Sequence, residues 1–464
     1  MKITIVDKKL ARKKSVDLVL SEKISANRFV ETNKGEILEI KVPKKEEMNM
    51  RKWIVLVRSI IQEAKKYRIA RININWKELT NFDNLNGNLS QLFAEAVYMA
   101  HYEFRKYKTP PKEGFADISE VVVVGKKTDK TLVRKDVRKG VTIAVQVNFC
   151  RDLANTPGGD MTPAKLVSVV RKAIKGTGIK MKVLDEKQMR RKKMNGVLAV
   201  GQGSSAQSRF IILEYTGTGQ NKKPICLVGK GVTFDSGGID TKPHPYALEM
   251  MMDMSGGAAV VATMITASKL GLKKNIVALI PAVENMAGGS SFRPGDIIKM
   301  MDGTSVEVGH TDAEGRLILA DAITYAKSYK PSLVVDVATL TGAAVVALGE
   351  RASAIFTADD DLADKTLEIA ETRGDYAWRL PLWDEYSAEI AGTHGDISNI
   401  RTKGQPGYGG AITAASFLKH FAKDHKSWMH IDIAPTMTAV FDEQLAKGAK
   451  GSPIRLLIGL LEQI

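Results

Sequence analysis

The chain has 464 residues, of which 44% are apolar and 26% are charged, as in ordinary soluble globular proteins. Its length exceeds what one hydrophobic core usually supports, which favours two domains. No apolar run approaches the roughly 20 residues that span a bilayer, and the first residues lack the pattern of a secretory signal. Cys150 and Cys226 form neither a disulfide framework nor a zinc motif, so we expect a cytoplasmic protein without a membrane segment.

Basic residues are concentrated in the first third of the chain. The net charge is +16, and residues 1–150 hold 31 Lys and Arg against 18 Asp and Glu, an excess of 13. Such an excess usually forms a solvated basic face. The alternative is a surface for nucleic acid or another polyanion, with the densest basic run at residues 125–140. No recognised nucleic-acid-binding motif accompanies that run.

Residues 1–140 alternate short β-branched runs with helical patterns. Strands are predicted at residues 2–6, 71–76 and 120–125, and helices at 50–67 and 89–104. The first helix places one apolar stripe on a single face: Trp53, Val57, Ile60 and Ile61. This alternation predicts a smaller amino-terminal α/β domain.

A long apolar helical pattern then begins at residue 141 and runs into "NTPGG" at residues 155–159, a strong helix breaker. We place the junction between the domains at residues 141–162. The next helix is expected to begin at Pro163, with Thr162 as its N-cap.

Residues 163–464 predict a larger α/β domain. Its expected elements are strands at 224–231, 275–285 and 331–342, helices at 256–272 and 314–329, and a hairpin at 296–308 that turns at Asp302-Gly303. The fold class is therefore α/β with two domains, and the larger one has a central mixed sheet flanked by helices.

Charged residues cluster in three segments of the larger domain, each placed at the end of a buried strand. These segments hold Lys230, Asp235 and Lys242; then Asp253; then Asp312, Glu314 and Arg316. Because sites in open α/β sheets form outside the carboxyl ends of strands, we expect the three segments to converge.

Four converging carboxylates repel one another and need either raised pKa values or cations between them. Two divalent ions suit four carboxylates, and an all-oxygen set favours Mg²⁺ or Mn²⁺, with zinc and cobalt as alternatives. A simpler interpretation remains open, in which Asp312 and Glu314 cap the following helix and Asp253 starts another. Lys230 would then be a surface turn residue.

Four motifs, "VGKGVTFDSGG", "HTDAEGRLILADA", "ATLTGA" and "DIAPTM", occur in this order. They resemble the leucyl aminopeptidase family, the two-metal cytosol aminopeptidases of peptidase family M17. The resemblance covers residues 145 to 464, and "RDLANTP" is similar to that family's interdomain segment. It implies a catalytic domain at residues 163–464 that carries a dinuclear metal site.

The resemblance also implies a role for each charged residue. Asp235 and Glu314 would bridge the metals, Asp312 would complete the tighter site, and Lys230 and Asp253 would complete the second. Lys242 would polarise the scissile carbonyl. Arg316 would hold a bicarbonate ion, the general base toward a water that bridges the metals.

Further residues match positions that line the family's pocket for the first substrate side chain: Met250, Thr339, Leu340, Gly342, Ala434 and Met437. Two methionines and small residues suit Leu or Met; the alternative for Met250 is ordinary core packing. The resemblance implies a leucyl aminopeptidase of peptides, assembled as a homohexamer, a dimer of trimers. Because some bacterial members bind DNA, a second role through the basic first third is the alternative.

One position departs from the family pattern. His310 stands where the family usually has Asn. We interpret it as a hydrogen-bonding replacement for Asn, and the alternatives are an altered substrate preference or a new pH dependence.

Overall fold

The computed structural model describes residues 1–7, 15–33, 35–126, 129–219, 222–405 and 407–464. They form two compact units, Met1–Asn148 with Ala439–Lys447, and Phe149–Thr438 with Gly448–Ile464. The predicted two-domain α/β class is confirmed. The predicted junction, 141–162, lies on helix α4 (Arg134–Ala154) and the loop after it, and residues 439–447 group with the first unit. Within the basic run 125–140, residues 127 and 128 lie outside the described residues.

The first unit is built on a six-stranded sheet in the order β1-β6-β5-β2-β4-β3, in which only β3 is antiparallel to its neighbour. Its strands are β1 (Lys2–Val6), β2 (Val16–Ser21), β3 (Arg28–Thr32), β4 (Gly35–Lys41), β5 (Arg71–Asn75) and β6 (Glu120–Val124). Helices α1 (Met50–Lys66) and α3 (Leu89–His101) share one core with the sheet. The predicted stripe of α1 is buried there, which confirms that helix. Trp76, predicted as strand, instead begins the short helix α2 (Trp76–Leu79).

The second unit is built on a nine-stranded mixed sheet in the order β16-β15-β18-β14-β9-β11-β8-β7, with β10 added beside β11. The strands that carry the site are β9 (Ile225–Gly229), β10 (Gly231–Asp235), β11 (Asn275–Asn285), β14 (Leu333–Ala338) and β18 (Trp428–Asp432). These five run parallel to their neighbours within the group. The outer strands are β7 (Lys180–Leu184), β8 (Arg209–Thr216), β15 (Ser353–Phe356) and β16 (Ala377–Arg379).

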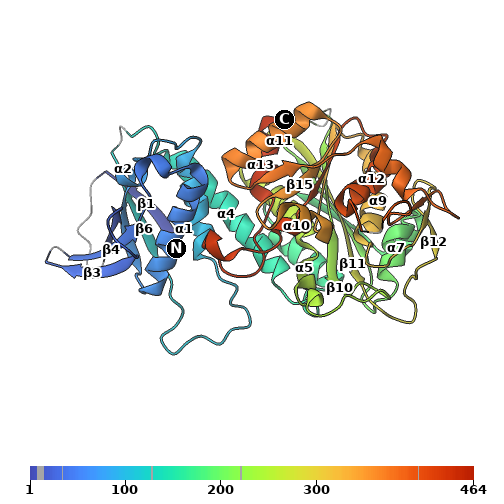
Figure 1. Cartoon of the computed structure of the whole chain (residues 1–464), viewed down its shortest axis with the longest axis horizontal. Coiled ribbons are helices and arrows are strands. Elements are labelled where there is room, and N and C mark those ends of the chain that lie inside the picture. Colours follow the sequence, from blue (N-terminus) through green and yellow to red (C-terminus); the bar gives the residue numbers. More distant parts are fainter. Residues whose placement is uncertain (8–14, 34, 127–128, 220–221, 406) are drawn as a thin grey trace. The chain divides into compact units, whose positions relative to one another are not determined.

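Helices cover both faces of this sheet (Figure 1). On β9, Cys226 and Val228 pack into the core beneath α9 (Gly315–Ala326), α7 (Asn195–Gly201) and α12 (Gly410–Ala422). Gly229 faces the other way, where a Cβ would lie only 2.7 Å from the Cα of Gly257 in α8 (Ser255–Lys269). Helices α11 (Asp360–Arg373) and α13 (Ile454–Gln463) pack against one another, and α13 also packs on α8. The glycines therefore let α8 lie close against the strand that leads into the site.

Smaller elements follow the sequence expectations closely. Helix α5 (Pro163–Ala173) begins as predicted, because the Thr162 hydroxyl accepts the backbone N–H of Lys165 at 3.3 Å. The predicted hairpin is β12 (Ile297–Lys299) and β13 (Ser305–Glu307), with Gly303 at φ +97° in its turn. Strand β17 (Ile397–Ser398) joins β13 in parallel and completes a separate three-stranded sheet.

Among the described residues, one helical stretch, Tyr246–Lys269, is long and apolar enough by composition to cross a bilayer. The sequence pattern does not indicate such a stretch, because Glu249 and Asp253 interrupt the apolar run. Its most apolar window is 89% buried inside the protein. Core helices of globular proteins pass the same test, so the stretch is weak evidence for a membrane segment.

Candidate metal centre

The carboxyl ends of the parallel strands meet at one edge of the nine-stranded sheet. Lys230 directly follows β9, Asp235 ends β10, Asn285 ends β11, and Thr339 follows β14. This edge is where ligands bind in open α/β sheets, as the sequence analysis expected.

The other two acidic segments reach this edge by a different route. Asp253 does not follow a strand but closes the 3₁₀ helix η2 (Tyr246–Met252) immediately before α8. Asp312 and Glu314 follow β13, which belongs to the small sheet rather than to the central one. The prediction that all three segments follow buried strands was therefore wrong for these two, although they do converge.

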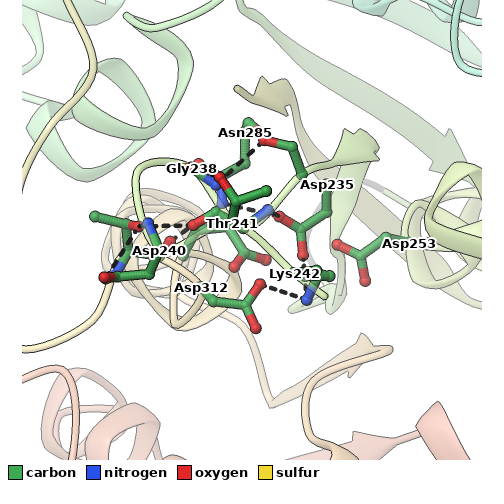
Figure 2. Close-up of polar contacts among 12 residues, drawn as sticks. Asp235, Gly238, Asp240, Thr241, Lys242, Asp253, Asn285 and Asp312 are labelled. Carbon is green, nitrogen blue, oxygen red and sulfur yellow. Dashed lines mark hydrogen bonds and ion pairs between the residues drawn. The ribbon is translucent and has the colours of Figure 1, made fainter. Parts of the chain in front are cut away.

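Two lysines bring the four carboxylates together. Lys230 Nζ lies 2.8 Å from Asp253 Oδ2 and 2.8 Å from Glu314 Oε1. Lys242 Nζ lies 2.9 Å from Asp235 Oδ2 and also pairs with Asp312 Oδ1. Figure 2 shows Lys242 between these two carboxylates, with Asp253 beside Asp235.

Burial and crowding change the acidity of these groups. Burial raises the pKa of Glu314 to about 7 and that of Asp312 to about 6, and the nearby Asp235 carboxylate adds to both shifts. Burial alone would lower the pKa of Lys230, whose side chain is only 3% exposed, but the carboxylates of Asp253 and Glu314 outweigh it and raise that pKa. The acids are therefore short of positive charge, while both lysines stay protonated.

The geometry of the acids fits a bound cation. One oxygen from each of Asp235, Asp312 and Glu314 lies within 4.8 Å of the others. Glu314 Oε2 is buried and has no hydrogen-bond partner in the described structure, a costly state for a carboxylate oxygen that a cation would relieve. Four carboxylates against two ammonium groups also leave a net negative charge. These residues therefore suit divalent metal binding.

The capping interpretation can be tested directly. Glu314 occupies the N-cap position of α9, yet its side chain makes no cap hydrogen bond. Asp312 instead pairs with Lys242, and Lys230 is buried rather than a surface turn residue. Helix capping thus does not account for these carboxylates.

Arg316 lies in the first turn of α9, 8% exposed. Its Nη1 donates to the backbone oxygen of Asn399 at 2.6 Å, whereas its buried Nε has no hydrogen-bond partner among the described residues. Burial lowers the pKa of Arg316 to about 10, so the guanidinium stays charged near neutral pH. A buried cation with a free donor is suited to hold a small anion.

Hydrogen bonds join the loop after β10, residues 235–242, to the loop that holds Asp312, residues 309–314. They are made by residues that the sequence analysis did not predict as part of the site. Asp240 Oδ2 accepts the backbone N–H of Thr311 at 2.8 Å, and the Thr311 hydroxyl donates to the Gly237 oxygen at 2.6 Å. Asn285 Nδ2 donates to Asp235 Oδ1 at 2.8 Å and to the Thr311 oxygen at 3.1 Å. Asn285 was recognisable as a polar residue at the end of a buried strand, a signal that the sequence analysis did not use.

His310 makes the contact that its interpretation as an Asn replacement requires. Its Nδ1 accepts the backbone N–H of Asp312 at 3.1 Å, two residues further along the chain. An Asn side chain makes the same local bond in an Asx turn. Residues 310–313 form a turn, closed by the Ala313 N–H on the His310 oxygen at 3.3 Å.

The predicted pocket residues come from three segments. Met250 lies in η2, Thr339 and Leu340 follow β14, Gly342 begins α10 (Gly342–Leu348), and Ala434 and Met437 lie in and after η5 (Ala434–Thr436). Asp432 joins two of these segments, because its Oδ1 accepts the N–H groups of Leu340 and Ala434, both at 3.0 Å. The Thr339 hydroxyl donates to Asp253 Oδ1 at 2.8 Å, which links the pocket segment to the acids.

Comparison with known proteins shows which family the chain is similar to. The profile "Cytosol aminopeptidase family, catalytic domain" matches residues 148–458. The "Probable cytosol aminopeptidase" of Chlorobaculum tepidum is 42% identical over 382 residues, covering 81% of this chain and 75% of that protein. The protein of the same description from Burkholderia mallei is 42% identical over 360 residues, covering 78% and 70%.

A solved structure described as "Bottromycin maturation enzyme BotP in complex with Mn" has a TM-score of 0.86 and 28% identity, covering 97% of this chain and 99% of that one. The profile match spans most of the second unit, including every charged residue of the metal centre. The resemblance seen in the sequence is confirmed: the chain belongs to the cytosol aminopeptidase family.

Proposed function

We propose that this aminopeptidase is metal-dependent and releases amino-terminal residues, preferably Leu or Met, from short peptides. Family membership supports a peptidase hydrolase; the metal, the residue preference and the proton acceptor are the proposed part. The observation that carries the proposal is the close group of Asp235, Asp312 and Glu314 oxygens. The Mn-bound structural relative adds support.

Asp235 and Glu314 are suited to face two cations at once, with Asp312 on one side and Lys230 and Asp253 on the other. Lys230 is protonated beside the uncompensated carboxylates, and it would have to give up its proton to become a ligand, which adjacent divalent cations favour. Two divalent ions, Mn²⁺ or Zn²⁺ with Mg²⁺ and Co²⁺ as alternatives, would supply Lewis acidity and a water of lowered pKa. Protein groups supply the remaining chemistry, described next.

The Lys242 ammonium lies beside Asp235 and Asp312, so it can stabilise negative charge that develops on the scissile carbonyl oxygen. Arg316, whose Nε has no hydrogen-bond partner among the described residues, is suited to hold bicarbonate, which would accept the proton of the attacking water. The free amino group of the substrate, which only a chain end offers, would bind on the Lys230 and Asp253 side.

The purified protein is expected to hydrolyse a leucyl chromogenic amide, to lose that activity on chelation, and to regain it with Mn²⁺ or Zn²⁺. The reason is that the proposed ions would supply the Lewis acid and the activated water, and the acidic group that would hold them is short of positive charge. The measurement is the rate of amide hydrolysis across a panel of aminoacyl amides and metals. Failure to hydrolyse any amide with any metal would refute the proposal.

A His310→Asn variant belongs in the same panel. Because Asn can accept the same Asp312 N–H, its ranking of aminoacyl amides should match that of the wild type, with rates within about threefold. A changed ranking would mean instead that His310 contacts the substrate.

We further propose, from the family resemblance, a cytoplasmic homohexamer built as a dimer of trimers that admits short peptides.

The basic excess in residues 1–150 supports a second candidate role in binding DNA or another polyanion. Retention on DNA that falls steeply with salt, and that an Asp235→Ala variant keeps, would separate this role from peptide hydrolysis. Retention that does not change with salt would argue against it.

A further inference from the structure

Asn399 is a fully buried residue directly after β17. In the described structure, all the hydrogen bonds of its side chain go to backbone groups of residues 309–313, in the metal loop that holds Asp312. Its Oδ1 accepts the backbone N–H groups of Gly309, at 2.7 Å, and His310, at 3.3 Å. Its Nδ2 donates to the backbone oxygens of His310, at 2.7 Å, and Ala313, at 3.3 Å. One side chain therefore fixes both ends of the turn that presents Asp312.

The backbone of Asn399 serves the other half of the site. Its oxygen accepts Arg316 Nη1 at 2.6 Å, and its N–H donates to the Glu307 oxygen at 2.9 Å. Strand β17 pairs in parallel with β13, with Glu307 opposite Ser398, so Asn399 is anchored to the strand from which the metal loop departs. Asn399 therefore contacts both the loop that holds Asp312, through its side chain, and Arg316, through its backbone oxygen.

We propose that Asn399 is the positioning residue of this centre: it fixes the turn that presents Asp312 relative to Arg316, and so controls metal affinity. The inference rests on the proposed metal-dependent function. Groups that orient metal ligands by hydrogen bonding typically contribute about 10- to 100-fold to metal affinity or activity when they are removed. A fully satisfied polar side chain surrounded by four backbone groups is also hard to replace, because each lost bond leaves a buried group unpaired.

The test compares Mn²⁺ binding by calorimetry in the full-length wild type and in Asn399→Ala, after both have been stripped with a chelator. We expect the dissociation constant to rise about 10- to 100-fold. At saturating Mn²⁺, kcat should remain lowered while KM changes little, because the backbone oxygen that accepts Arg316 Nη1 is kept but the turn that presents Asp312 is no longer fixed relative to it. The isosteric Asn399→Asp variant keeps the two accepted bonds but places a carboxylate oxygen against the His310 and Ala313 oxygens, so it should also raise the dissociation constant.

Asn275 offers a matched control. It makes the same kind of clamp, accepting the Thr218 N–H at 3.1 Å and donating to the Gly219 and Lys222 oxygens at 3.0 Å each. It lies at the opposite end of β11 from Asn285, roughly 33 Å along the strand. Asn275→Ala should lower the melting temperature without changing the Mn²⁺ dissociation constant.

Wild-type affinity for Mn²⁺ in a folded Asn399→Ala or Asn399→Asp protein would overturn the inference, whatever the activity. Failure of both variants to fold would also overturn it, because the residue would then serve the fold rather than the site. A wild type that neither binds Mn²⁺ nor hydrolyses amides would instead refute the proposed function itself.

Discussion

Replacing Glu314 by Gln is expected to abolish metal binding, because Glu314 is proposed to face both cations. It is also expected to lower kcat/KM by about 10³-fold or more. The substitution removes one charge from a residue that is 1% exposed and keeps its shape. Metal ions supply several kcal/mol of charge stabilisation to a transition state, and each 1.4 kcal/mol corresponds to about tenfold in rate. Amide hydrolysis and Mn²⁺ calorimetry on the same preparation measure both effects.

The same substitution should leave the chelator-treated protein at least as stable as the wild type. Folding raises the pKa of Glu314 from its ordinary 4.5 to about 7, so the folded state holds a proton that the unfolded state releases, and stability falls as the pH rises from 4.5 to about 7. The advantage of Gln should therefore be absent below pH 4.5, grow between 4.5 and about 7, and level off above 7. Wild-type protein should gain melting temperature on adding Mn²⁺, whereas the variant should gain none. A variant with an undiminished Mn²⁺-induced gain would contradict the assignment.

Glu120 is the control, because it is buried but lies in a satisfied environment in the first unit. The Thr4 hydroxyl donates to it, Arg71 and Lys2 pair with it, and its pKa is lowered to about 2. Here ionisation favours the folded state at any pH above 4.5, and that contribution is lost as the pH falls toward 2. Glu120→Gln should thus lower the melting temperature at pH 7 and leave the Mn²⁺-induced gain intact.

The sequence was sufficient to predict features that depend on local patterns. The apolar stripe of α1, the Thr162 cap and the Asp302-Gly303 turn each follow from a few neighbouring residues, and the structure has all three. For the segment with Lys230 and Asp235, the position was also predictable, because β9, β10 and β14 are apolar runs followed by polar residues. Their end at one edge of the sheet follows from parallel pairing.

Residues whose role depends on long-range contacts could not be found in this way. Asn399 is 89 positions from His310, Asp240 is 71 from Thr311, and Asp432 is 92 from Leu340. No periodicity or spacing in one sequence reveals which buried polar group meets which loop. The route of Asp253 was missed for a related reason: the apolar "EMMMDM" gives no sign that a 3₁₀ helix ends there.

Replacing Lys242 by Met is expected to separate catalysis from metal binding. If Lys242 stabilises the developing oxyanion, its loss should lower kcat about 10²- to 10³-fold. The same ammonium pairs with Asp235 and Asp312, two of the proposed ligands, so it competes with any cation for their charge. The variant should therefore bind Mn²⁺ at least as tightly as the wild type while turning over far more slowly.

Lys327→Met is the matched control, since Lys327 is a partly exposed lysine paired with the single carboxylate of Asp424. It should change neither kcat nor Mn²⁺ affinity. If Lys242→Met instead weakened Mn²⁺ binding in proportion to its loss of activity, Lys242 would be acting on the ligands rather than on the substrate. The oxyanion role requires that kcat falls while Mn²⁺ affinity stays the same or rises. Loss of the ammonium removes a contact to the reacting carbonyl, and it also leaves Asp235 and Asp312 free to bind the cation.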